Sequence, residues 1–212
     1  MNGMTHSDEI KVLIIEDHPL MRLGVASIIS AQQDMTVVAE AGSGEQAIEL
    51  FRGHHPDVVV VDLGLPQMGG VAVIRALRLL SSEAKFVVLT TYEGDEDIYQ
   101  ALAAGAHAYV IKGQPHNMLV DAIRRVRRGT NYVPPALMHK LDARNALEEL
   151  SAQELRVLKM ISEGRSNRDI GAVLGVTEAT VKYHVSEILA RLGAKDRTEA
   201  VVIALRRGLL HL

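Results

Sequence analysis

The sequence contains no cysteine in its 212 residues. Disulfide bonds and thiolate metal sites are therefore excluded, and a reducing compartment poses no difficulty for the chain. No apolar run reaches the roughly 18 residues that a membrane-spanning helix needs, so we expect no membrane association. The opening residues, MNGMTHSDEI, lack a basic segment followed by an apolar one. We therefore expect no secretion signal and a cytoplasmic location.

Apolar content is high and charge is uneven. Hydrophobic residues make up 48% of the chain, and its length suffices for one large or two ordinary domains. Residues 1–128 contain 11 basic and 16 acidic side chains, a net charge of −5, whereas residues 148–212 contain 10 and 9, a net charge of +1. This difference indicates two parts with different tasks, but it does not by itself indicate nucleic-acid binding.

Five short apolar runs alternate with five helical patterns over the first 128 residues. Consecutive Val, Ile and Leu residues indicate strands buried on both faces, as in a parallel sheet covered by helices. An open α/β sheet of this kind binds ligands outside the carboxyl ends of its strands. The expected strands are KVLIIED (11–17), MTVVAEA (35–41), DVVVVD (57–62), AKFVVLTT (84–91) and AHAYVIK (106–112).

The second part of the chain has a different pattern. Residues 129–147 hold the only Pro-Pro pair and no strand pattern, which predicts a linker with one short helix near 135–142. Beyond it the periodicity is helical, with breaks at Gly164, Gly175 and Gly193. Four short helices are predicted, at 152–163, 167–174, 178–192 and 197–208.

Ionisable residues close several of the expected strands. Glu16 and Asp17 end the first and Asp62 ends the third, and these strands are neighbours in a flavodoxin-like order. Carboxylates this close repel one another unless a cation lies between them, and oxygen ligands suit Mg²⁺. A metal beside Asp62 would also shield it from an incoming phosphate, which makes it a candidate acyl-phosphate nucleophile. Thr90 and Lys112 end the fourth and fifth strands and could bind phosphoryl oxygens.

Residues 9–128 resemble the receiver domain of two-component response regulators. The pair ED, the stretch DLGLPQMGG and the block VVLTTYEGDEDIYQALAAGAHAYVIK carry the resemblance. It implies a phosphate accepted from a sensor histidine kinase, a magnesium ion and a two-state switch. The implied phosphoacceptor is Asp62; the implied metal ligands are Glu16, Asp17, Asp62 and the Gly64 carbonyl; the implied switch residues are Thr90, Tyr109, which would turn inward, and Lys112.

Two positions depart from the receiver pattern. Gly113 stands where relatives of this subgroup often carry Asp, and Ala108 stands where they often carry Gly. Neither touches the implied phosphorylation chemistry. His18 follows the acidic pair and is interpreted as a residue that starts a helix, although it borders the site.

Several other patterns compete with this interpretation. GSGEQA (42–47) matches a dinucleotide-binding fingerprint with Asp62 at suitable spacing, but it follows the second strand instead of the first. A dinucleotide site would also leave Glu16, Asp17, Thr90 and Lys112 unexplained, and a turn with Ser43 as a helix N-cap accounts for the pattern. A haloacid-dehalogenase-type hydrolase would need an Asp at the position of Gly64. The basic run RRVRR (124–128) is interpreted as a solvated helix end.

The segment TEATVKYHVSEILARLG (177–193) predicts an amphipathic helix with Thr177 as its N-cap. Val181, Val185, Ile188 and Leu192 form one apolar stripe. The opposite face carries Lys182, Tyr183 and Ser186, side chains suited to base edges and phosphates. With the preceding short helix it would form a helix-turn-helix, although an ordinary amphipathic helix would show the same period.

Residues 148–210 resemble the LuxR-type helix-turn-helix domain nearly end to end, most specifically in TVKYHVSEILARLGAKDRTEAV. A receiver followed by this domain is the arrangement of the NarL/FixJ class. The resemblance implies that Lys182, Tyr183 and Ser186 face the major groove, with Thr180, His184 and Arg191 as candidate phosphate contacts. We expect the side chains of both Lys182 and Arg191 to be exposed.

The sequence as a whole predicts a flavodoxin-like receiver at 9–128, a linker at 129–147 and a four-helix DNA-binding domain at 148–212. The resemblance implies a DNA-binding transcriptional regulator that dimerises when phosphorylated, with double-stranded DNA as a partner and RNA polymerase as a further candidate. No enzyme activity is expected beyond autophosphorylation from small donors and slow self-dephosphorylation. A nicotinamide-binding enzyme and a regulator that never uses phosphate remain the alternatives.

Overall fold

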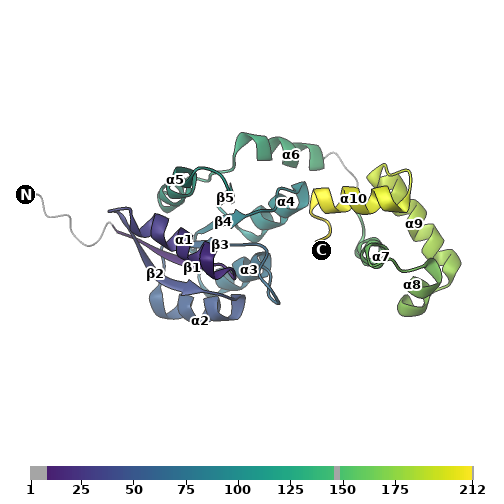
Figure 1. Cartoon of the computed structure of the whole chain (residues 1–212), viewed down its shortest axis with the longest axis horizontal. Helices are drawn as coiled ribbons and strands as arrows, with labels where there is room; N and C mark the ends of the chain where they lie inside the picture. The colour runs from purple at the N-terminus through teal and green to yellow at the C-terminus, as the bar shows by residue number, and fades with distance from the viewer. Residues whose placement is uncertain (1–8, 146–148, 212) are drawn as a thin grey trace, which may run out of the picture. The chain divides into compact units, whose positions relative to one another are not determined.

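The computed structural model describes residues 9–145 and 149–211 of the chain. It contains two compact units. One comprises the residues up to Tyr92 together with Ile98–Pro135, and the other comprises Glu93–Asp97 and Ala136–Leu212. All five named strands belong to the first unit, and the chain from α6 onward is helical (Figure 1).

The first unit is built around a parallel sheet with the strand order β2-β1-β3-β4-β5, which confirms the flavodoxin-like prediction. Ile15 pairs with Val61 in the β1–β3 register. The residues that follow them, Glu16 and Asp62, therefore leave the sheet side by side. The strands are β1 (Ile10–Ile15), β2 (Met35–Ala41), β3 (Val58–Val61), β4 (Phe86–Thr90) and β5 (Ala108–Ile111).

Helices cover both faces of this sheet. Alternate strand residues, such as Val12, Val60 and Leu89, form one core with apolar residues of α1 and α5. Every residue of β3 and β4 is buried, which accounts for their uninterrupted apolar sequence. The helices are α1 (Pro19–Ser30), α2 (Gly44–His54), α3 (Gly70–Leu80), α4 (Asp95–Ala104) and α5 (His116–Arg127).

A glycine positions the loop that follows β3. A Cβ atom on Gly70 would collide with the carbonyl oxygen of Asp62, so only glycine allows α3 to begin this close to the strand end. The backbone around Asp62 is consequently fixed by the packing of α3.

The residues expected to begin the linker extend the sheet unit. The Tyr132 N–H donates to the carbonyl of His107 (2.9 Å), and the Tyr109 N–H donates to the carbonyl of Tyr132 (3.0 Å). The Tyr132 ring packs against the core, with the Arg125 guanidinium 5.2 Å from its centre. The chain thus follows the edge of β5 beyond residue 128 before α6 (Pro135–Asn145) begins.

Four helices follow, each within one residue of its predicted ends: α7 (Ala152–Ser162), α8 (Asn167–Leu174), α9 (Glu178–Leu192) and α10 (Arg197–Arg207). Their apolar faces share one core, which includes Leu158, Ile170, Val181 and Ile188. Among the described residues, no helix is long and apolar enough to cross a membrane.

Candidate phosphoacceptor and DNA-binding sites

The carboxyl ends of β1, β3, β4 and β5 bring the predicted acid-site residues together. Lys112, just after β5, places its Nζ 2.8 Å from Glu16 Oε2 and 2.7 Å from Asp62 Oδ2. All three side chains are nearly buried, with exposed fractions of 9%, 3% and 7%. One ammonium therefore bridges two carboxylates that would otherwise repel each other at the edge of the sheet.

The bridge determines the charge of Lys112. Burial alone would lower the pKa of this ammonium, but hydrogen bonds to Asp62 and Glu16 and the charges of these carboxylates outweigh burial and raise the pKa. Lys112 is therefore a cation at neutral pH. It lies where it could also meet negative charge placed on Asp62.

Asp62 has a second contact on its other oxygen. Its Oδ1 accepts a hydrogen bond from the Gly64 N–H (3.3 Å), so the loop after β3 turns back over the carboxylate. The residue is 6% exposed. The Gly64 N–H and the Lys112 ammonium thus hold the two oxygens of Asp62 in one orientation.

Glu16, Asp17 and His18 form a group of potential metal ligands, in which one ligand atom from each lies within 4.8 Å of the others. Asp62, which the resemblance also implies as a metal ligand, is not part of this group among the described residues. Asp17 Oδ1 is buried and has no hydrogen bond to any described residue, although His18 Nδ1 lies 2.9 Å away. A buried carboxylate oxygen without a hydrogen bond beside the Glu16 carboxylate suits a hard divalent cation, so these residues fit Mg²⁺.

Thr90 and Tyr109 lie behind the acid site and are fully buried. The Tyr109 hydroxyl donates to the carbonyl of Tyr92 (2.9 Å), and the Tyr92 N–H donates to Thr90 Oγ1 (3.3 Å). The peptide groups of Tyr92 thus connect both side chains. In this structure Tyr109 is turned inward.

Tyr92 is a residue that sequence reasoning missed. Its hydroxyl oxygen lies 3.2 Å from where a Cβ on Gly64 would be, and that Cβ would lie 3.7 Å from Asp62 Oδ2. The absence of a side chain at Gly64 therefore leaves room for the phenol above the acid site. Its position two residues after Thr90 is the sequence feature that could have identified it.

The competing patterns have structural explanations. The Ser43 hydroxyl accepts from the Gln46 N–H and caps α2, as the turn interpretation of GSGEQA predicts. A Cβ on Gly44 would lie 2.7 Å from Val73 Cγ2, so this glycine serves the packing of α2 on α3.

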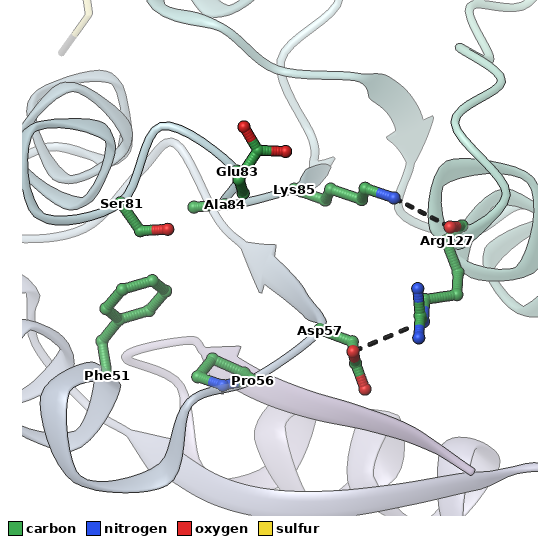
Figure 2. Close-up of a pocket in the computed structure, with 8 residues that line it drawn as sticks. All are labelled: Phe51, Pro56, Asp57, Ser81, Glu83, Ala84, Lys85 and Arg127. Carbon is green, nitrogen blue, oxygen red and sulfur yellow. Dashed lines mark hydrogen bonds and ion pairs between the residues drawn. The ribbon is translucent and has the colours of Figure 1, made fainter. Parts of the chain in front are cut away.

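The basic run at the end of α5 is engaged in internal contacts. Arg124 binds Asp34 through two hydrogen bonds of 2.7 and 2.8 Å. Arg127 pairs with Asp57 at 3.4 Å, and the Lys85 ammonium donates to the Arg127 carbonyl at 2.8 Å. Figure 2 shows the two Arg127 contacts along one side of a pocket of about 280 Å³ at the amino ends of β3 and β4. Arg125, Arg127 and Arg128 are exposed, as expected for a solvated helix end, and the run lies at the end of the sheet opposite Asp62.

The second unit presents α9 after a tight turn. Gly175 ends α8 with a φ of 69°, a left-handed conformation that favours glycine, and the Thr177 hydroxyl then caps α9. Val181 and Ile188 are buried, and Val185 and Leu192 pack against the same core. The predicted apolar stripe of α9 is therefore confirmed.

The opposite face of α9 is exposed where the sequence placed DNA contacts. The Lys182 side chain is 64% exposed and lies 2.9 Å from Glu178, and Tyr183 is 62% exposed. Ser186 is exposed and donates to the Lys182 carbonyl (3.1 Å). Thr180 and His184 are half-buried, Thr180 beside the capping Thr177 and His184 edge-on to the Tyr183 ring.

Arg191 differs from expectation. Its side chain is only 30% exposed, its Nη1 donates to the Glu149 carbonyl (2.7 Å), and its Nε lies 3.5 Å from Glu154 Oε1. Glu154 is buried and belongs to the capping box at Ser151. Burial raises the pKa of Glu154, but the Ser151 hydrogen bonds and the Arg191 charge lower it overall. The prediction of an exposed Arg191 was wrong, because a buried carboxylate attracts it.

Comparison with known proteins accounts for both units. Residues 12–124 match the response regulator receiver domain, and residues 148–204 match the luxR family of bacterial regulatory proteins. The chain is 34% identical over 207 residues to the response regulator protein VraR of Staphylococcus aureus, a match that covers 95% of this chain and 99% of VraR. The chain belongs to the response regulators. This regulator therefore has a receiver domain and a LuxR-type DNA-binding domain, and its family is not one of enzymes.

Solved structures agree with this assignment. The regulator is 36% identical to the response regulator ChrA of a heme-sensing two-component system, with a TM-score of 0.58 over 96% of this chain and all of that one. A response regulator of the LuxR family from Aurantimonas shares 31% identity over 65% of this chain and 98% of that one, with a TM-score of 0.62. RcsB in complex with DNA has a TM-score of 0.68 at 20% identity, covering 93% of this chain and 98% of RcsB, and shows the fold alone.

Proposed function

We propose that Asp62 is the phosphoacceptor of this regulator and receives its phosphate from a sensor histidine kinase. The observation that carries the proposal is the buried bridge from Lys112 to Glu16 and Asp62. It holds the Asp62 carboxyl in place at the carboxyl ends of the strands and places a cation ready for the negative charge that phosphorylation adds.

The chemistry is a phosphoryl transfer. A carboxylate oxygen of Asp62 attacks phosphorus, the bond between phosphorus and the donor imidazole nitrogen breaks, and the imidazole leaves. Mg²⁺, when bound, neutralises charge on the phosphoryl oxygens. Glu16, Asp17, Asp62 and the Gly64 carbonyl are the residues that would hold it. Lys112 pairs with the phosphoryl group, and the Thr90 hydroxyl turns toward it.

The regulated output is operator binding. Phosphate on Asp62 favours a receiver conformation in which Thr90 and Tyr109 have moved, and a population shift of this kind favours dimers. Two copies of α9 then read half-sites about 34 Å apart in the major groove. Lys182, Tyr183 and Ser186 are the proposed base-reading residues, because they are exposed together on the face opposite the apolar stripe. RNA polymerase remains a candidate further partner.

Labelling with a small acyl phosphate donor and Mg²⁺ tests the phosphoacceptor. Intact mass should show one added phosphate that is acid-stable and base-labile, and Asp62→Asn should show none. Asp57→Asn is a matched control, since Asp57 precedes the same strand at the opposite sheet edge. Equal labelling of Asp62→Asn and the unchanged protein would refute the assignment.

Phosphorylation with the same donor also tests whether phosphate favours dimerisation and DNA binding. Beryllofluoride or phosphorylation should shift sedimentation from monomer toward dimer and increase affinity for a DNA sequence selected from a random pool. A regulator that never uses phosphate would show neither change. The complete set of Glu16, Asp17, Asp62, Thr90 and Lys112 argues against that alternative.

A further inference from the structure

His18 occupies a helix N-cap position without acting as a cap. It precedes Pro19 in extended conformation, and its side chain makes no capping hydrogen bond to α1. Ser, Thr, Asp and Asn are the residues that normally satisfy the first N–H groups of a helix. The imidazole at this position is therefore not explained by the stability of α1.

The ring is turned toward the acid site instead. His18 Nδ1 lies 2.9 Å from Asp17 Oδ1 and 3.3 Å from Glu16 Oε1. The His18 side chain is 74% exposed, so an ion can reach it from solvent. Lys112 lies against the other oxygen of Glu16, Oε2. The oxygens that face His18 are therefore not those that Lys112 bridges.

These distances suit a shared metal ion. Nitrogen and oxygen atoms that bind one Zn²⁺ ion lie about 2.0–2.2 Å from it. Two such atoms are therefore at most about 4.4 Å from each other. Donor atoms of Glu16, Asp17 and His18 already lie within 4.8 Å of one another. A small side-chain rotation would close the remaining gap.

We propose that His18 adds a nitrogen ligand to the acid site, so that the site accepts borderline divalent cations such as Co²⁺ and Zn²⁺ in addition to Mg²⁺. The inference rests on the proposed metal site at Glu16 and Asp17. Imidazole suits Zn²⁺ and related transition metals, whereas Mg²⁺ prefers oxygen and retains water. His18 thus sets which metals the regulator binds, and Mg²⁺ is held without it.

Metal titration of the full chain tests this directly. Calorimetry with Co²⁺ and, separately, Mg²⁺ should give a Co²⁺ affinity at least tenfold weaker in His18→Ala, with the Mg²⁺ affinity changed less than twofold. His54→Ala is the matched control, because His54 is exposed and bonds the Leu50 carbonyl at the far end of α2. His54→Ala should leave the affinities of the acid site for Co²⁺ and for Mg²⁺ unchanged.

Proton NMR of the Co²⁺-loaded protein supplies a second measurement. A ligating imidazole gives a strongly shifted, exchangeable ring N–H signal, which should be present in the unchanged protein and in His54→Ala and absent from His18→Ala. Persistence of the signal in His18→Ala, or equal weakening of Co²⁺ and Mg²⁺, would overturn the role of His18. Unaltered Mg²⁺ binding in Asp17→Asn would instead overturn the metal site itself, and the inference with it.

Discussion

Replacing Lys112 by Met removes the one cation that bridges Glu16 and Asp62. Methionine fills a similar volume without charge, so the change isolates the ammonium. Both carboxylates are nearly buried, with exposed fractions of 3% and 7%. We therefore expect Lys112→Met to destabilise the receiver strongly when no divalent cation is present and much less when one is.

The magnitude follows from the contacts. Removing one partner of a buried ion pair costs about 3–5 kcal/mol, because the remaining charge is left uncompensated. We expect about 3 kcal/mol, the lower end of this range. Mg²⁺ at 100 times its dissociation constant adds about 2.7 kcal/mol of stability. This gain should be larger in the variant at a given Mg²⁺ concentration, because the ion no longer competes with an ammonium.

Urea unfolding followed by circular dichroism, with and without Mg²⁺, measures this effect, and hydrogen exchange assigns it to the strands β1, β3 and β5. A loss of 3 kcal/mol lowers the urea midpoint by about 1.5 M if the slope is about 2 kcal/mol per molar. Lys85→Met is the matched control, since that ammonium donates to the Arg127 carbonyl at the opposite sheet edge. A Lys112→Met midpoint equal to that of the unchanged protein without Mg²⁺ would refute the reasoning, as would equal stabilisation of both by the ion.

Three further predictions follow from the described contacts. Crystal structures with and without beryllofluoride should show Tyr109 in two different rotamers, one exposed and one buried, and one unchanged rotamer would exclude a switch. Lys182→Ala should weaken binding to the selected operator by about 1–3 kcal/mol and relax the preference at one base pair. Lys159 is also exposed, and Lys159→Ala should have neither effect. Equal operator binding by the two variants would refute the proposal that α9 reads bases. A hydrogen bond from Arg124 is the main cause that lowers the pKa of Asp34, so the pair stabilises above about pH 4 and loses this as pH falls through the lowered value. Arg124→Gln should therefore cost at most about 1 kcal/mol at pH 7, and a difference between the thermal melts that does not shrink as the pH falls below about 4 would contradict this.

The sheet and the acid site were predictable from local sequence. Four consecutive valines buried on both faces can form only an interior strand, and the β1–β3 register then places Asp62 beside Glu16. The strand order alone then predicts that Thr90 and Lys112 lie at the same carboxyl-terminal end of the sheet. The helix ends in the second unit were equally local, because Ser151, Ser166 and Thr177 each cap the helix that follows.

What could not be predicted depends on side chains that find partners distant in sequence. Arg191 has the period of a surface residue, yet its guanidinium reaches the buried Glu154 and the Glu149 carbonyl. Tyr132 lies in a segment without a strand pattern, yet it pairs with the edge of β5. Neither contact leaves a signal in spacing or composition, since each is decided by which groups remain unpaired when the helices and strands pack.

The position of Tyr92 indicates how the acid site and the buried tyrosine could be coupled. Its N–H bonds the Thr90 hydroxyl and its carbonyl accepts from Tyr109, so one short backbone segment holds both side chains. A Thr90 hydroxyl that turns toward a phosphoryl group must give up the Tyr92 N–H. Such a movement would alter the position of the Tyr92 segment and with it the carbonyl that accepts from the Tyr109 hydroxyl. A change at Asp62 could therefore reach Tyr109 through Thr90 and the backbone of Tyr92, without direct contact between Tyr109 and Asp62.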